Sequence, residues 1–162
     1  MTPNQLPTDG VALLTALDPV SSSAAQTSAW VAVQNFHSFL ALVDVGAFGA
    51  SATVDFKLMQ AKDNSGTGSK ALTNASTGAT KAITQLLAAG GNNRQAFINA
   101  RASDLDQLNG FGYIAMVLTV GTAASLVSAE LLGFYPRFEP PVDSAANPAI
   151  NLGASTVAQI VN

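Results

Sequence analysis

The stretch that decides the fold is GYIAMVLTVGTAASLVSAELLGFYPRF, residues 112–138. Successive side chains of a strand point to opposite faces, and one side of the first half of this stretch is wholly apolar. That side consists of Ile114, Met116, Leu118 and Val120. Residues 126–132 are again strand formers, and the small residues 121–125 between the halves are typical of a hairpin loop. The pattern predicts a central β-hairpin that contains no chemically reactive group.

Two earlier stretches also have strand character. Residues 53–60 alternate between apolar and polar, which is typical of a half-buried antiparallel strand, with Val54, Phe56 and Leu58 inward. Residues 39–45 are apolar on both sides except at Asp44, which favours a strand covered on two faces.

The region after residue 69 is less clear. Residues 80–89 fit either one face of a helix or a strand, and we favour a strand that forms a hairpin with residues 95–100 across the turn at 90–93. Ser103 and Asp106 then form a capping pattern for one short helical turn.

The chain divides by composition into three parts. Residues 1–29 contain three prolines and one short apolar piece and are predicted to be an N-terminal arm, although Asp9 could cap a short helix that ends before Pro19. Residues 30–138 form the β domain, and residues 139–162, again with three prolines, form a C-terminal arm. Six to eight short strands with Gly and Asn turns predict an all-β fold, an antiparallel β-sandwich or jelly roll.

Composition excludes several classes of partner. Charged residues make up 10% of the 162 residues, the net charge is −3, and no basic cluster is present, so we expect no nucleic-acid partner. No apolar run is long enough for a spanning helix, so we expect no membrane partner. The N-terminus lacks a secretory pattern, so we expect a protein that is made in the cytoplasm and is not exported by a signal peptide. The absence of cysteine excludes disulfides and thiolate chemistry.

The titratable residues do not form a catalytic pattern. His37 is the only histidine and has no evident triad partner. Asp44 and Asp55 could lie on neighbouring strands, but Asp44 is better interpreted as structural, paired with Lys57 or Arg101 if it points inward. We therefore expect no enzyme activity and no small-molecule substrate.

Two motifs partly match known binding loops. Residues 110–115 fit G-x-G-x-x-A, but they open a run of strand formers and not a helix, so a turn that starts a strand is the better interpretation. Asp104, Asp106 and Asn109 partly match a calcium loop, but Ala115 occupies the position of its final Glu, and a helix cap explains them better. The sequence predicts no catalytic, cofactor or metal site.

The segments DVGAFGASATVDFKLMQAKDNSGTGSKAL (44–72), 94–106 and TVG (119–121) resemble small virion proteins encoded beside the major capsid gene in tailed bacteriophages and prophages. The resemblance covers residues 28–135 and leaves both arms outside. It implies a structural role on the phage head as a decoration (cement) protein, with no catalytic residues to transfer.

We therefore expect a homotrimer on the capsid surface that binds the major capsid protein. Its interface residues are predicted in the aromatic patch near 134–138, which could equally be core at a strand end, and in the C-terminal arm. They are Phe134, Tyr135, Arg137, Phe138, Val142, Ile150 and Leu152. Two alternatives remain open: a head-tail connector or tail-tube protein, and a carbohydrate-binding jelly-roll adhesin that uses Trp30, Tyr113 or Tyr135.

Overall fold

A computed structural model describes residues 6–138 and Val157. The other residues of the predicted C-terminal arm, with Val142, Ile150 and Leu152, lie outside the described part of the chain. The elements in chain order are the single-turn helix α1 (Pro7–Gly10) and the strands β1 (Val11–Ser22), β2 (Ala25–Thr27), β3 (Val31–Ala32), β4 (Phe36–Val45), β5 (Thr53–Ala61), β6 (Lys70–Ala71), β7 (Leu86–Leu87), β8 (Arg94–Arg101), β9 (Tyr113–Gly121) and β10 (Ser125–Pro136). Three short 3-10 turns lie at Ala88–Gly90, Ala102–Asp104 and Gln107–Asn109. In the described part, no helix is both long and apolar enough to cross a membrane.

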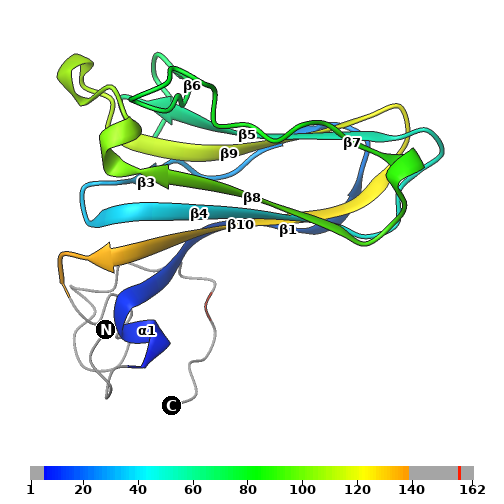
Figure 1. Ribbon diagram of the computed structural model, residues 1–162, viewed down its shortest axis with the longest axis horizontal. Helices are drawn as coiled ribbons and strands as arrows, with labels where there is room; N and C mark the ends of the chain where they lie inside the picture. Colours follow the sequence, from blue (N-terminus) through cyan, green and yellow to red (C-terminus); the bar gives the residue numbers. More distant parts are fainter. Residues whose placement is uncertain (1–5, 139–156, 158–162) are drawn as a thin grey trace.

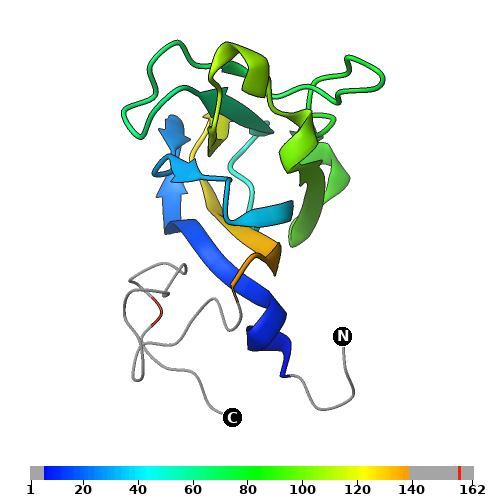
Figure 2. The ribbon, with the colours of Figure 1, turned by 90° about the vertical axis from the view of Figure 1, so that its left-hand side faces the viewer.

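The strands form two stacked antiparallel sheets, seen in side view in Figure 1 and end-on in Figure 2. The first sheet has the order β1-β10-β4-β8, and the second has the order β2-β9-β5-β6, with β3 beside β9 and β7 beside β5. Consecutive strands mostly alternate between the sheets, so the two sheets are interleaved along the chain. This confirms the predicted all-β sandwich, and the strand order is that of a jelly roll.

The core lies between the two sheets and follows the alternation of the strands. Phe56 and Leu58 on β5 are at most 1% exposed, as are Ile114, Met116 and Leu118 on β9. Strand side chains alternate between faces, and the neighbours Asp55 and Lys57 on β5 are exposed. The predicted inward faces of these two strands are confirmed.

The predicted central hairpin is wrong in its pairing. Both strands form, but β9 belongs to the six-stranded sheet and pairs with β5, whereas β10 pairs with β1 and β4 in the other sheet. The connection at 122–124 therefore turns the chain from one sheet into the other. It packs against Gly49, where a side-chain Cβ would collide with the carbonyl oxygen of Ala124. Two apolar strands joined by a short turn can bury their apolar sides in one core whether they pair as a hairpin or lie in opposite sheets. The local sequence pattern therefore does not distinguish a hairpin from a crossing between sheets.

The prediction of an arm over residues 1–29 is contradicted from Val11 onward. Residues 11–22 form β1, an edge strand paired with β10, and Ala12 and Leu14 lie in the core. Pro19 is accommodated because β1 is an edge strand and its register shifts between Leu17 and Val20. The predicted short helix is limited to residues 7–10.

Within residues 80–89 the favoured strand forms only in part, as the two-residue β7, because residues 88 and 89 belong to a 3-10 turn, and the segment does not pair with residues 95–100. Ile83 donates its N–H to the carbonyl of Phe56, and β7 pairs with the start of β5, whereas β8 pairs with β4 in the other sheet. The predicted helical turn near Ser103 is present as two 3-10 turns that end at Gly110, whose φ is +83°.

Candidate functional site

The outward side of the four-stranded sheet carries a band of apolar side chains, which we call the outer face. Its members are Leu13 on β1, Leu40 and Leu42 on β4, Phe97 on β8, and Leu132 and Phe134 on β10. The register places Leu13, Leu132 and Leu40 side by side, with Leu42 beside Phe97 in the next row. Phe97 is 60% exposed and the others are partly exposed.

The outer face exists because these strands are apolar on both sides. On β4, Phe39, Ala41, Val43 and Val45 point into the core, so Leu40, Leu42 and Asp44 between them point outward. The prediction that residues 39–45 are covered on two faces is therefore not met by the described residues, in which the outward side chains stay partly exposed.

An open cleft of about 810 Å³ lies at one end of the outer face, and we call it the end cleft. Its floor and sides come from the start of β4, the end of β8, the end of β10 and the loop at 74–81. The lining residues are His37, Ser38, Phe39, Leu40, Asn74, Ala75, Ser76, Lys81, Asn99, Ala100, Arg101, Ser103, Asp104, Phe134 and Tyr135. The outer face and the end cleft share Leu40 and Phe134.

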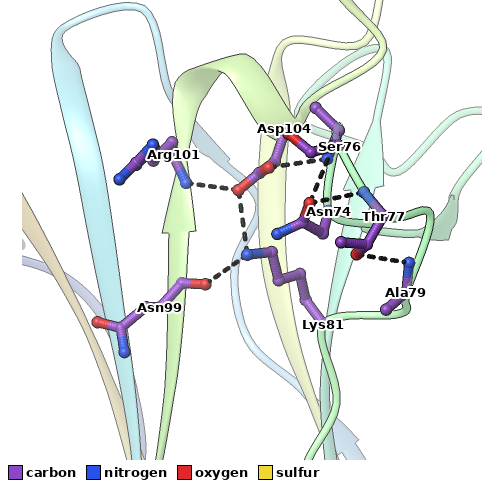
Figure 3. Close-up of polar contacts among 9 residues, drawn as sticks. Asn74, Ser76, Thr77, Ala79, Lys81, Asn99, Arg101 and Asp104 are labelled. Atoms are coloured by element: carbon purple, nitrogen blue, oxygen red, sulfur yellow. Dashed lines mark hydrogen bonds and ion pairs between the residues drawn. The ribbon is translucent and has the colours of Figure 1, made fainter.

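The loop wall of the end cleft is held by Asp104 (Figure 3). Its carboxylate accepts the N–H of Ala75 at 3.0 Å and the N–H of Arg101 at 2.9 Å, and it pairs with the Lys81 ammonium at 3.2 Å. Lys81 also donates to the carbonyl of Asn99 at 2.9 Å. Burial of Asp104 alone would raise its pKa, but the two N–H groups and Lys81 together hold the pKa below its usual value.

Arg101 and Tyr135 are the exposed members of the end cleft with the most binding capacity. The Arg101 side chain extends away from Asp104 in Figure 3, and its guanidinium has no hydrogen-bond or ion-pair partner among residues 6–138. Tyr135 is 65% exposed and has a φ of +53°, a left-handed conformation that costs a non-glycine residue about 1 to 2 kcal/mol. The structure thus retains strain at an exposed aromatic that lines the same cleft as an unpaired guanidinium.

The aromatic patch predicted as an interface lies at the surface and not in the core. Phe134 is half-buried on the outer face, while Tyr135, Arg137 and Phe138 are exposed. The outer face also contains surface residues that were not predicted from the sequence: Leu13, Leu40, Leu42, Phe97 and Leu132. The apolar character of both sides of residues 39–45 was the available signal.

The polar residues weighed for catalysis lie apart. Asp44 is on the outward side of β4 and forms no ion pair with the described side chains. Asp55 is on β5 in the other sheet and accepts a hydrogen bond from Gln85. They are therefore not on neighbouring strands. His37 is exposed at the rim of the end cleft.

The motif residues have structural partners. The 110–115 motif is a turn that starts β9, as predicted. Asp106 pairs with Lys70 at 2.6 Å and accepts from Asn109, and the Lys70 hydrogen bond is the main cause that lowers the Asp106 pKa. Within the described ranges, no three His, Cys, Asp or Glu residues gather as a metal site would require.

The aromatics proposed for sugar stacking are divided between the sheets. Tyr113 is on β9 and Tyr135 on β10, and the indole of Trp30 lies against Gly66, where an added Cβ would be 2.6 Å from Nε1. Only Tyr135 reaches the end cleft. A platform built from all three side chains is not formed.

Comparison with known proteins gives only distant likenesses. No protein family and no curated protein matches the chain. Among solved structures, the crystal structure of the SPBc2 prophage-derived protein YomS is 14% identical with a TM-score of 0.42, over 76% of this chain and 93% of that one. An electron cryo-microscopy structure of a Cowpea Mosaic Virus empty virus-like particle is 11% identical with a TM-score of 0.39, over 85% and 86%. At TM-scores below 0.5, neither likeness defines a shared fold or function.

Proposed function

We propose that this protein is a structural component of a virion, a capsid decoration protein that binds the phage head through the outer face. The observation that carries the proposal is the band of outward apolar side chains across all four strands of one sheet. Solvated sheet faces are normally polar, and a contiguous apolar patch marks an interaction site.

The size of the outer face suits a protein partner. Strands about 4.8 Å apart and residues about 3.4 Å apart give the outward side of the four-stranded sheet, over the register of β4 with β8, an area of roughly 500 Å². The apolar band covers part of that area and shares it with polar side chains, among them Asp44, Asn99 and Glu130. A standard interface takes roughly 800 Å² from each partner, so the face with its flanking loops is of the right order. A flat sheet surface offers a small molecule little enclosure, whereas a second protein surface can cover its apolar side chains.

The sequence resemblance and the fold also support the virion role. The resemblance of residues 28–135 to small phage virion proteins implies a place on the head. The jelly roll is a common fold of viral capsid domains, although it also occurs in lectins, so the fold alone is only an analogy. The proposal includes no enzyme activity, a homotrimer, and the major capsid protein as the partner of the outer face.

The test is cosedimentation with phage heads assembled without this protein. The full chain should sediment with the heads, in a copy number comparable with that of the major capsid protein. Leu42→Asp places a charge on the outer face and should abolish binding. Val117→Asp is the matched control, because Val117 is a partly exposed residue on β9 in the other sheet, and this variant should still bind.

Three results would contradict the proposal. If the full chain does not bind heads, the decoration role is wrong. If it occurs in virions as a single ring at the portal, the connector alternative replaces it. If Leu42→Asp and Val117→Asp bind equally well, the outer face is not the contact surface.

A further inference from the structure

The end cleft has the size and openness of a peptide-binding site. Its volume of about 810 Å³ falls within the range of roughly 300 to 1,000 Å³ that is usual for ligand sites. Three strands form one side of it and the 74–81 loop the other, held in place by Asp104. An open cleft between a sheet and a loop can accept a short extended chain.

The charges in the end cleft favour an anionic group. The cleft contains the cationic side chains of Lys81 and Arg101, with Asp104 as its one carboxylate, although the protein has a net charge of −3. Asp104 is already satisfied by Lys81 and two backbone N–H groups. The Arg101 guanidinium remains without a partner in the described structure, and its planar fork matches a carboxylate.

The aromatic side of the end cleft favours an apolar neighbour for that anion. Phe134 is part of the floor, and Tyr135 stands exposed at the rim in a strained backbone conformation. Its neighbours fix that conformation, because Pro136 is paired with Phe36 on β4 and is buried. Backbone strain that is retained at an exposed aromatic is a common property of binding sites.

The continuity of the end cleft with the outer face indicates that the anion belongs to a protein. Leu40 and Phe134 belong to both surfaces. A partner that covers the leucine rows therefore extends directly into the cleft. A free carbohydrate would use the tyrosine and the polar rim but would leave the adjoining apolar rows exposed.

We infer that the end cleft binds an extended acidic peptide segment of the protein that covers the outer face, with a carboxylate on Arg101 and an apolar side chain against Phe134 and Tyr135. This inference rests on the proposed function, because it names the chemistry of the partner at that same surface. The specific contact is the charge-assisted pair, and the apolar contact fixes its position.

The probe is a capped peptide of alternating Glu and Leu, titrated into the full chain and followed by two-dimensional NMR. We expect shifts at Arg101, Tyr135 and their neighbours, and weaker binding as salt is raised. Arg101→Gln should weaken binding about 10- to 100-fold, the range for loss of a hydrogen bond to a charged group. Arg94→Gln is the matched control, because Arg94 is at the other end of β8, and this variant should bind like the unaltered protein.

Two further probes separate the alternatives. The same peptide with Gln in place of Glu should not bind. An acidic oligosaccharide, oligogalacturonate, should bind more weakly than the peptide. Stronger oligosaccharide binding would overturn the inference in favour of the adhesin alternative, and equal peptide binding by Arg101→Gln and the unaltered protein would refute it.

The head-binding assay distinguishes failure of this inference from failure of the proposed function. Arg101→Gln should bind heads more weakly than Arg94→Gln does. If the unaltered protein binds heads and Arg101→Gln binds them equally well, the end cleft is not used although the decoration role stands. If the unaltered protein does not bind heads, the decoration role fails whatever the peptide does.

Discussion

Asp104 provides the sharpest test of how the sandwich closes at the end cleft. It follows β8 in one sheet, and Lys81 lies in the loop that runs along the other sheet, so their ion pair joins the two layers. The Asp104 side chain is 8% exposed and that of Lys81 is 16% exposed. Asp104→Asn removes the charge from two hydrogen bonds and from the ion pair with Lys81, and it reduces the acceptor oxygens from two to one. Charge-assisted hydrogen bonds contribute about 1.5 to 3 kcal/mol each, and part of that is retained, so we expect a loss of about 3 kcal/mol in the free energy of unfolding.

The effect should depend on pH with a defined sign. The pKa of Asp104 is lowered in the folded protein, whereas in the unfolded chain it is near the ordinary value of about 3.9. The carboxylate's contribution is therefore complete above about pH 4, and it is lost as the pH falls through the lower folded-state pKa. Asp104→Asn has no such group, so the difference between the two proteins should shrink over this acid range.

The assay is urea unfolding at pH 7 and at two acid pH values, followed by the fluorescence of Trp30, the only tryptophan. Asp55→Asn is the control, because Asp55 is an exposed carboxylate with one hydrogen bond to Gln85, and its change should cost less than about 1 kcal/mol. A loss below about 1 kcal/mol for Asp104→Asn would refute the reasoning about the ion pair. If the difference in the free energy of unfolding between Asp104→Asn and the unaltered protein stays constant down to acid pH, the role of the Asp104 charge is refuted.

Two further predictions concern the core and the C-terminal segment. Phe56 is 1% exposed, so Phe56→Ala should lower the free energy of unfolding in urea by about 3 to 5 kcal/mol. Phe97 is 60% exposed, so Phe97→Ala should lower it by less than about 1 kcal/mol. Similar losses for the two variants would show that the face assignment of β5 is wrong. The hydrophobic core identified in the described chain lies within residues 12–131. Deletion of residues 140–162 should therefore leave the circular dichroism nearly unchanged while it weakens trimer formation or head binding, and a truncated protein that assembles and binds as tightly as the full chain would remove the segment from the assembly.

The parts of the fold that could be predicted are those set by the chain's own alternation. Phe56 on β5 and Met116 on β9 point inward because a strand places every second side chain on one face. Strand partners could not be predicted in the same way. The pattern of residues 113–136 fits two strands of one hairpin and fits equally well two strands in different sheets. Only the pairing of β10 with β1 and β4 decides between these arrangements, and both partner strands are far away in the sequence.

The N-terminal strand was missed for a related reason. Residues 11–17 are compatible with a short helix or a strand, and Asp18 and Pro19 disfavour both a helix and a central strand. An edge position resolves this conflict, because one side of β1 needs no ladder partner. The sequence cannot show that β10 leaves an edge free for β1, since that depends on where four separate strands assemble.

The candidate site was predicted only at its aromatic end. Phe134 and Tyr135 were recognisable because aromatic residues beside Arg137 have the composition of an interface. Arg101 gave no such signal, because it becomes part of the site only when the end of β8 lies beside the start of β4 and the 74–81 loop. A site assembled from segments this far apart has no local sequence pattern.

The ion pair of Asp104 and the guanidinium of Arg101 have different roles in the same cleft. Variants of the two residues can therefore distinguish an effect on stability from an effect on partner binding. Asp104 holds the 74–81 loop through Ala75 and Lys81, so its loss should both destabilise the protein and displace one wall of the end cleft. Arg101 contributes only its backbone N–H to that arrangement, and Arg101→Gln keeps the N–H while it removes the charge that faces the cleft. Weaker binding at unchanged stability in Arg101→Gln therefore identifies a direct contact with the partner. If Asp104→Asn weakened binding as well, we would attribute the weaker binding to displacement of the loop wall, because the carboxylate of Asp104 is already used within the protein.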